Sequence, residues 1–174
     1  MDINASDIYS FYQTKLGGIV KRIIRQKIMS YLDEVDTNII YGYGYTSPYL
    51  SFINKHNASS QVKELRPDFL DGAVQEKYDF EEKAIHEYFI PLEPSTVDVV
   101  ISSHLLEFVE KPISSIEEIW RILKPNGYFI TILPRRSGLW SRYDNNPFGY
   151  GRSYSSKQFQ KLIEDFFVLD NKKS

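Results

Sequence analysis

The stretch Asp98-Val-Val-Ile-Ser-Ser-His-Leu-Leu-Glu107 predicts a buried strand over residues 98–102 that ends in a polar turn. Its apolar residues follow one another without alternation, which is typical of a strand covered on both faces. Downstream, Ser114 and Ser115 each precede a glutamate by three residues, and this capping-box spacing predicts the start of a helix. Lys124-Pro-Asn-Gly127 then predicts a turn, and residues 128–133 the next strand.

The same alternation of strands and helices extends outward from this stretch. Further strands are expected at residues 37–41, 61–65 and 83–89. Helices are expected over residues 6–33 with a break at Gly17-Gly18, after Ser47-Pro48, and after a cap at Ser155 or Ser156. Such alternation predicts an α/β fold, a doubly wound and mostly parallel sheet with helices on both faces.

A chain of 174 residues suits a single domain. We expect residues 1–36 to form an N-terminal helical cover, 37–134 the core, and 135–174 a loop and the last helix. Within the cover, Lys21, Arg22, Arg25 and Lys27 lie mostly opposite an apolar side. A basic amphipathic helix can lie on a membrane, but a covering helix with a solvated face is the interpretation that we favour.

The composition narrows the classes of function. The chain has no cysteine, which excludes thiol chemistry and Cys-based metal sites and is typical of a reducing compartment. No two of its three histidines are four residues apart, so no metal site is expected. The net charge of −2 gives no strong sign of nucleic-acid binding, and no apolar run is long enough to span a membrane. We therefore expect a cytoplasmic protein.

The turn Gly42-Tyr-Gly44-Tyr-Thr-Ser47 lies between a predicted strand and a predicted helix. Ligands of parallel sheets bind at the carboxyl ends of the strands, and glycine lets the backbone approach them closely. Ser47 replaces the third glycine of a dinucleotide fingerprint, and no Gly-Lys-Ser/Thr follows, which excludes a phosphate loop of the Walker type. A tight turn without a ligand is the alternative.

Residues 98–107, together with Ile119-Trp-Arg-Ile-Leu-Lys-Pro-Asn-Gly127-Tyr-Phe-Ile, resemble the signature of S-adenosylmethionine-dependent methyltransferases of the type-11 group. The resemblance covers roughly residues 37–134. Residues 11–17, 42–50, 138–140 and 147–152 also look like a bacterial subgroup of this family. The resemblance implies a Rossmann-like fold, S-adenosyl-L-methionine as the cofactor and a methyl acceptor that the sequence does not identify.

The resemblance also implies cofactor-binding residues at the strand ends. Gly42 and Gly44 would face the methionine part of the cofactor. An acid at the end of the second strand would hold both ribose hydroxyls. Glu64 is the nearest acid, although Leu65 stands at the position of the family's acid. The alternative for Glu64 is a solvated surface charge. The full set is Tyr41, Gly42, Gly44, Tyr45, Glu64, Leu65, His86, Glu87, Ser103 and His104.

The later strand ends carry the remaining roles. His86, with Glu87 beside it, stands at the position from which the family binds the adenine amine. The alternative is that His86 is an ordinary strand residue without a ligand. Ser103 and His104 would line the pocket, and His104 is either a general base or a locally packed side chain. No catalytic residue is assigned, because methyl transfer mainly requires alignment of the reactants.

The chain departs from the family at its end. The resemblance implies an antiparallel hairpin after the last helix, and a chain that stops at Ser174 is too short for it. We therefore expect an uncovered edge along residues 128–133 and self-association through it. Residues 135–154, rich in arginine and aromatics, are expected to cover the acceptor side, and a loop packed over the sheet is the alternative. The alternatives to an active methyltransferase are a degenerate, non-catalytic binding or interaction module and, less favoured, a nicotinamide-dependent dehydrogenase.

Overall fold

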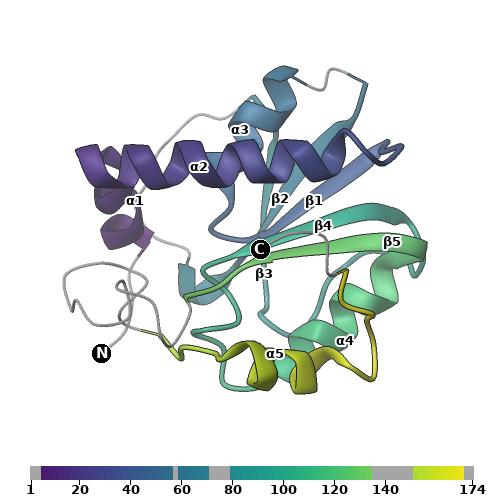
Figure 1. The fold of residues 1–174 in the computed structure, drawn as a ribbon. Helices are drawn as coiled ribbons and strands as arrows, with labels where there is room; N and C mark the ends of the chain where they lie inside the picture. The colour runs from purple at the N-terminus through teal and green to yellow at the C-terminus, as the bar shows by residue number, and fades with distance from the viewer. Residues whose placement is uncertain (1–4, 57–58, 71–78, 135–150, 171–174) are drawn as a thin grey trace.

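The computed structural model describes residues 5–56, 59–70, 79–134 and 151–170. Its centre is a five-stranded sheet in the order β3-β2-β1-β4-β5, in which every pair of neighbours is parallel (Figure 1). The strands are β1 (Ile39–Gly44), β2 (Gln61–Pro67), β3 (Glu81–Ile85), β4 (Val97–Ser103) and β5 (Leu123–Ile132). The helices are α1 (Ala5–Gln13), α2 (Lys15–Leu32), α3 (Ser47–His56), α4 (Pro112–Ile122) and α5 (Ser156–Ile163), with a 3₁₀ turn, η1, at Asp68–Leu70.

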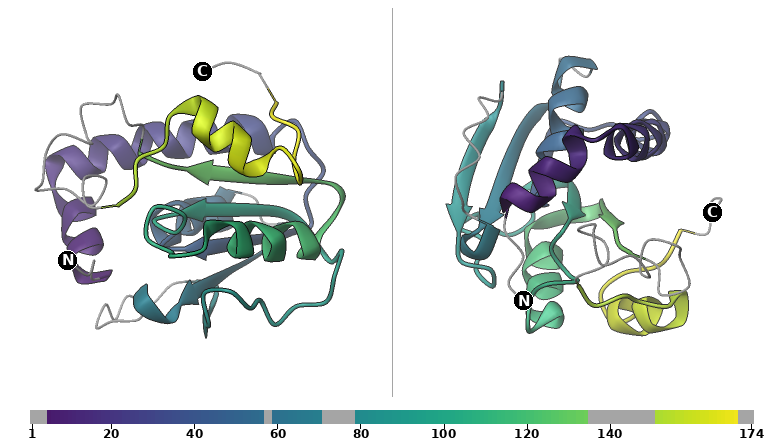
Figure 2. Two further views of the ribbon diagram at one scale, coloured as in Figure 1. Left: turned by 90° about the horizontal axis from the view of Figure 1, so that it is seen from below. Right: turned by 90° about the vertical axis from the view of Figure 1, so that its left-hand side faces the viewer.

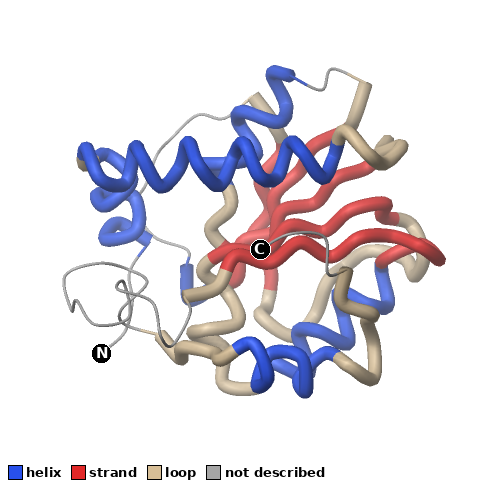
Figure 3. Tube along the Cα trace, viewed as in Figure 1, coloured by secondary structure: helices blue, strands red, loops and turns tan. Residues whose placement is uncertain are grey.

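The helices form a layer on each side of the sheet. Figures 1 and 3 show α1, α2 and α3 over one face and α4 and α5 over the other, and the turned views in Figure 2 agree. Val99 and Ile101 of β4 belong to the core beneath α1–α3, whereas Val100 between them belongs to the core beneath α4 and α5. The predicted doubly wound fold is confirmed, and the two cores explain why β4 shows no alternation.

The strand order places a switch point between β1 and β4. The chain builds β1, β2 and β3 toward one edge, and β4 and β5 then extend the sheet toward the other. At such a point, neighbouring crossovers leave in opposite directions and open a crevice outside the carboxyl ends of the strands. The fold therefore places a ligand site after Gly44 and Ser103.

Several strand ends differ from the sequence-based prediction. β1 runs to Gly44 instead of residue 41 because Gly44 still pairs with Ser103 of β4. β2 runs to Pro67 instead of residue 65, and β3 covers 81–85 instead of 83–89. β5 begins at Leu123, so the expected turn at residues 124–127 lies within the strand, beside an irregularity in the pairing of β4 with β5.

The break in the N-terminal helix was placed wrongly at Gly17-Gly18. It lies at Thr14, whose side chain accepts a hydrogen bond from the Gly17 amide at 3.0 Å and caps α2. Gly17 is needed for a different reason, because a Cβ there would lie 2.0 Å from the carbonyl oxygen of Phe11. The glycine allows the two helices to approach each other closely.

The start of α4 and its buried face also require correction. The helix begins at Pro112, a residue suited to the first helical position, and not at a serine cap. Its buried apolar residues are Ile116, Ile119 and Ile122, whereas Ile113 and Trp120 are 50% and 55% exposed, although the sequence pattern of Ile113, Ile116, Trp120 and Leu123 predicts that they share one face. By contrast, the predicted cap of the last helix is confirmed, since Ser155 and Gln158 form a reciprocal capping box.

No helix in the described ranges is long and apolar enough to cross a membrane. β5 lies at one edge of the described sheet, and Tyr128 on it is 47% exposed.

Candidate functional site

The turn after β1 is fixed to the end of β4. The amide of Tyr45 donates a hydrogen bond of 2.9 Å to the carbonyl oxygen of Ser103. Gly44, just before it, has a φ of 105°, a conformation that glycine adopts without strain. The turn is therefore built onto the switch point, where a parallel sheet offers its ligand site.

The two glycines of this turn make room for protein atoms. A Cβ at Gly44 would lie 2.3 Å from the carbonyl oxygen of Ser103, and one at Gly42 would lie 2.0 Å from the hydroxyl of Thr46. We expected these positions to leave space for a ligand, but in the structure the space is already filled by the β4 backbone and by α3. The glycines are thus required for the close packing of strand against strand and strand against helix.

Glu64 is completely buried, so it is not a solvated surface charge. Its Oε1 accepts hydrogen bonds from the amide and the hydroxyl of Thr46, at 2.6 and 2.8 Å. Its Oε2 accepts from the hydroxyl of Ser47 at 2.6 Å and from the guanidinium of Arg66 at 2.7 Å. Four donors fill the acceptor capacity of a carboxylate. In this arrangement Glu64 braces the first turn of α3 and has no acceptor left for ribose.

Leu65 points into the opposite core and is 1% exposed, packed with the residues beneath α4. The first acid beyond the end of β2 is Asp68, which is exposed at the start of η1. Sequence reasoning missed it because β2 was expected to end at residue 65, two residues before its actual end at Pro67. The indication was present in the sequence, since Pro67 marks a strand end more clearly than Leu65 does.

His86 and Glu87 follow the end of β3. The carbonyl oxygen of Glu87 accepts hydrogen bonds from the hydroxyl of Tyr43 on β1 and from that of Ser115 on α4. This segment is therefore anchored to two other elements through its backbone. The ring of His86 is exposed and lies edge-on to Tyr88, with ring centres 5.8 Å apart.

Ser103 and His104 are both buried, so neither faces solvent. The Nε2 of His104 lies 3.0 Å from the hydroxyl oxygen of Tyr12 on α1, which in turn lies 2.5 Å from that of Tyr49 on α3. On the other side of the ring, Nδ1 lies 3.6 Å from the carboxylate of Glu107. The loop after β4 is thus joined to α1 and α3 through a buried chain of polar side chains.

Burial controls the protonation of this chain. It lowers the pKa of His104 to about 3, because a charged imidazolium is poorly solvated there. It also raises the pKa of Glu107 to about 8, for the same reason acting on a carboxylate, although backbone hydrogen bonds partly oppose the shift. Both groups therefore favour their neutral forms near neutral pH, and the 3.6 Å contact is not a charged ion pair.

Sequence reasoning missed Tyr12 and Glu107. Glu107 was visible as an acid three residues after His104, directly behind a buried strand. Tyr12 gave no comparable indication, because it lies 92 residues from His104 in the chain.

The tyrosines of the turn contribute to the cores. Tyr43 and Tyr45 are almost fully buried on opposite faces of the sheet, and Tyr41 is 9% exposed. The guanidinium of Arg66 lies over the ring of Tyr45, 5.1 Å from its centre. These residues hold the turn in place from both sides.

Most of the expected substrate-side loop, including Trp140 and Arg142, lies outside the described residues. The end of that loop is described, and it packs on the segment after β4. The amide of Arg152 donates to the carbonyl oxygen of Glu107 at 2.8 Å, and the hydroxyl of Tyr154 donates to that of Leu106 at 2.9 Å.

A cleft of about 360 Å³ lies at the opposite edge of the sheet. It is lined by residues 34–37, Asp98 and residues 124–128, near the amino ends of β1 and β4. This is the wrong edge for the ligands of a parallel sheet, so we do not place the site there. Within the described ranges, no group of three or more His, Asp or Glu side chains is arranged to hold a metal ion.

Comparison with known proteins adds independent findings. The model of a family described as "Methyltransferase domain" matches residues 30–131. A highly reducing polyketide synthase, pkhB, of Emericella nidulans is 29% identical over 101 residues, which are 58% of this chain. The match spans 4% of that protein's length.

Two solved structures show the same fold. A SAM-dependent methyltransferase from Thermotoga maritima, described as a possible histamine N-methyltransferase, has a TM-score of 0.68 at 15% identity, over 92% of this chain and 75% of that one. The geranyl diphosphate C-methyltransferase of Streptomyces coelicolor, solved with S-adenosyl-L-homocysteine, has a TM-score of 0.61 at 16% identity, over 83% of this chain and 58% of that one.

Proposed function

Because the chain belongs to the methyltransferase domain family matched over residues 30–131, we propose that it binds S-adenosyl-L-methionine at the carboxyl edge of β1 and β4. It would transfer the methyl group to an acceptor whose identity stays open. The observation that carries the proposal is the hydrogen bond from the Tyr45 amide to the Ser103 carbonyl oxygen, which builds the turn after β1 onto the switch point.

The residues beyond the strand ends fit such a cofactor by their chemistry. Asp68, exposed after β2, has two carboxylate oxygens that can accept hydrogen bonds from both ribose hydroxyls. His86, exposed after β3, has a ring nitrogen that can accept a hydrogen bond from the adenine amine when the ring is neutral. Asp68 therefore replaces Glu64 as our candidate for the ribose contact.

The chain's own contribution to the reaction is positioning. S-adenosyl-L-methionine supplies a methyl group that its sulfonium already activates, so the protein need only align the acceptor with it. Glu64 supports this role by fixing Thr46 and Ser47 in the turn. His104 is buried against Tyr12, so in this arrangement it does not reach an acceptor as a general base. Its part is to hold the loop after β4 in place.

Two variants test the cofactor site by calorimetry with S-adenosyl-L-homocysteine. Asp68→Asn and His86→Ala should each weaken binding, by roughly tenfold or more for Asp68→Asn, because hydrogen bonds to a charged group contribute about 1.5–3 kcal/mol each. Asp165→Asn, an exposed acid beyond α5, is the matched control and should bind like the wild type. Unchanged affinity in both site variants would refute these assignments. The cytoplasmic location expected from the sequence stays a prediction.

A further inference from the structure

The outward side of α2 carries an apolar stripe. Leu16, Ile19 and Ile23 are 46%, 47% and 52% exposed. Their spacing of three and four residues places them on one face of the helix, one above another. The buried residues of the helix, Gly17, Ile28 and Leu32, lie on a different face. α2 is therefore a covering helix, as expected, but its solvent side is not simply polar.

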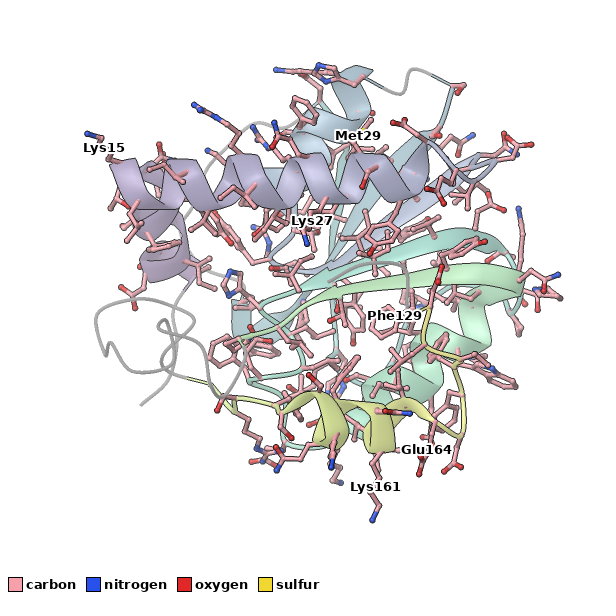
Figure 4. The ribbon with its side chains drawn as sticks, in the orientation of Figure 1. Lys15, Lys27, Met29, Phe129, Lys161 and Glu164 are labelled. Atoms are coloured by element: carbon pink, nitrogen blue, oxygen red, sulfur yellow. The ribbon has the colours of Figure 1, made fainter. Side chains whose placement is uncertain are left out.

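Exposed cations flank this stripe. Lys15, Arg22 and Lys27 are exposed, and Figure 4 labels the first and last of them along α2. The helix contains five Lys and Arg residues and no acid, although the whole chain has a net charge of −2. Among the described residues, these three side chains form no ion pair with a carboxylate. Positive charge is thus concentrated on one helix of a slightly acidic protein.

The helix is anchored with this face turned outward. The guanidinium of Arg25 donates a hydrogen bond of 2.7 Å to the carbonyl oxygen of Pro48 at the start of α3, and it also lies over the ring of Phe52. Ile28 and Leu32 are at most 4% exposed in the core below. The stripe and its cations are therefore available without any rearrangement of the fold.

We propose that the outer face of α2, comprising Lys15, Leu16, Ile19, Arg22, Ile23 and Lys27, binds an anionic lipid surface. Charge complementarity identifies this partner, because the cations attract acidic headgroups while their apolar stems reach along the interface. The apolar residues between the cations then lie at the boundary of headgroups and acyl chains, the arrangement of an interfacial amphipathic helix. A nucleic acid would satisfy the cations but would leave Leu16, Ile19 and Ile23 without an apolar partner.

Vesicle co-sedimentation tests the proposal with the full chain. The protein should sediment with vesicles of phosphatidylcholine and phosphatidylglycerol, should remain in the supernatant with phosphatidylcholine alone, and should dissociate as salt rises. Replacing Lys15, Arg22 and Lys27 by glutamine should weaken binding roughly a hundredfold. The matched control replaces Lys157 and Lys161 on α5 by glutamine and should bind like the wild type.

A second pair of variants tests the apolar stripe. Ile19→Ser with Ile23→Ser should weaken binding by about tenfold or more. Ile113→Ser on α4, at 50% exposure, should leave it unchanged. Circular dichroism shows whether each variant is folded. If a serine variant unfolds, the charge variants still test the proposal, because they alter only exposed side chains.

Three outcomes would overturn the proposal. The first is equal behaviour with both kinds of vesicle, and the second is an equal loss of binding in the α5 or α4 control. The third is absence of vesicle binding together with evidence for another partner. A shift in the sedimentation coefficient of the serine variants would assign the face to a protein partner. Loss of binding to duplex DNA in the glutamine variants would assign it to a nucleic acid. Vesicle binding needs no cofactor, so its failure is separate from failure of the proposed methyltransferase function.

Discussion

The carboxylate of Glu64 on β2 accepts a hydrogen bond of 2.6 Å from the backbone amide of Thr46, in the turn after β1. The acid that sequence reasoning assigned to a ligand is thus an internal brace for the turn that would hold that ligand. Both oxygens are saturated, and the guanidinium of Arg66 donates to the same carboxylate while its other terminal nitrogen pairs with Glu82.

We predict that Glu64→Gln destabilises the protein by about 2 kcal/mol, because it removes one of the two carboxylates that pair with the buried Arg66, Glu82 being the other, and turns one acceptor into a donor. Urea unfolding followed by circular dichroism measures this change. Glu81→Gln is the control, since it removes an exposed ion pair with Lys63 and should change stability little. Equal stability of the two variants would show that the brace is unimportant.

We predict that Gly44→Ala is destabilising by about 2 kcal/mol or more, because it adds a Cβ 2.3 Å from the Ser103 oxygen at a φ of 105°. Gly18→Ala is the matched control. A Cβ there has no neighbour within 4 Å, and alanine in a helix is favoured over glycine by roughly 1 kcal/mol. Thermal unfolding should therefore move in opposite directions for the two variants, and a shared direction would contradict the packing role of Gly44.

The buried carboxyl of Glu107 predicts a pH dependence of stability. Its pKa is raised to about 8 in the folded protein from a usual value of 4.5. The stabilisation from keeping it neutral is fully present below pH 4.5 and is lost as the pH rises toward 8, because the unfolded chain releases the proton first. His104, with its pKa lowered to about 3 from 6.5, has the opposite dependence and loses stability as the pH falls below 6.5.

The two effects cancel between pH 4.5 and 6.5, so the decline due to Glu107 should be seen between pH 6.5 and 8. Glu107→Gln should remove that decline, whereas Glu110→Gln, an exposed neighbour, should keep it. Urea unfolding at pH 6.5, 7.25 and 8 measures the slope. A wild-type stability that stays level over this range would mean that Glu107 is already ionised and paired with a charged His104.

The position of β5 at the edge of the described sheet predicts self-association. Residues 128–132 carry no charge, and edges of this kind recruit other strands. Sedimentation velocity should show a mass that increases with concentration, and Tyr128→Lys should shift the protein toward the monomer. Trp120→Lys, at a similarly exposed position on α4, is the control. A wild type that is monomeric throughout would refute this prediction.

The sequence was sufficient to predict the fold, but it predicted the residues of the candidate site only in part. The apolar run at residues 99–101, the glycine turn and the cap at Ser155 are local patterns, and they were sufficient to predict the doubly wound sheet. The direction of a side chain is not local. β2 continues to Pro67 instead of ending at residue 65, so Glu64 lies three residues before the strand end and Asp68 is the first exposed acid beyond it. The contact of Tyr12 with His104 depends on tertiary packing and has no local pattern.

The central claim, a site for S-adenosyl-L-methionine at the carboxyl ends of β1 and β4, is tested most directly by titrating the isotopically labelled protein with S-adenosyl-L-homocysteine and, separately, with NAD, while amide resonances are recorded. We predict saturable binding of S-adenosyl-L-homocysteine alone, with the largest shifts at residues 42–47, 68, 86 and 103–105. Binding of NAD in its place, no binding by the folded protein, or shifts confined to the cleft at residues 34–37 and 124–128 would contradict the account.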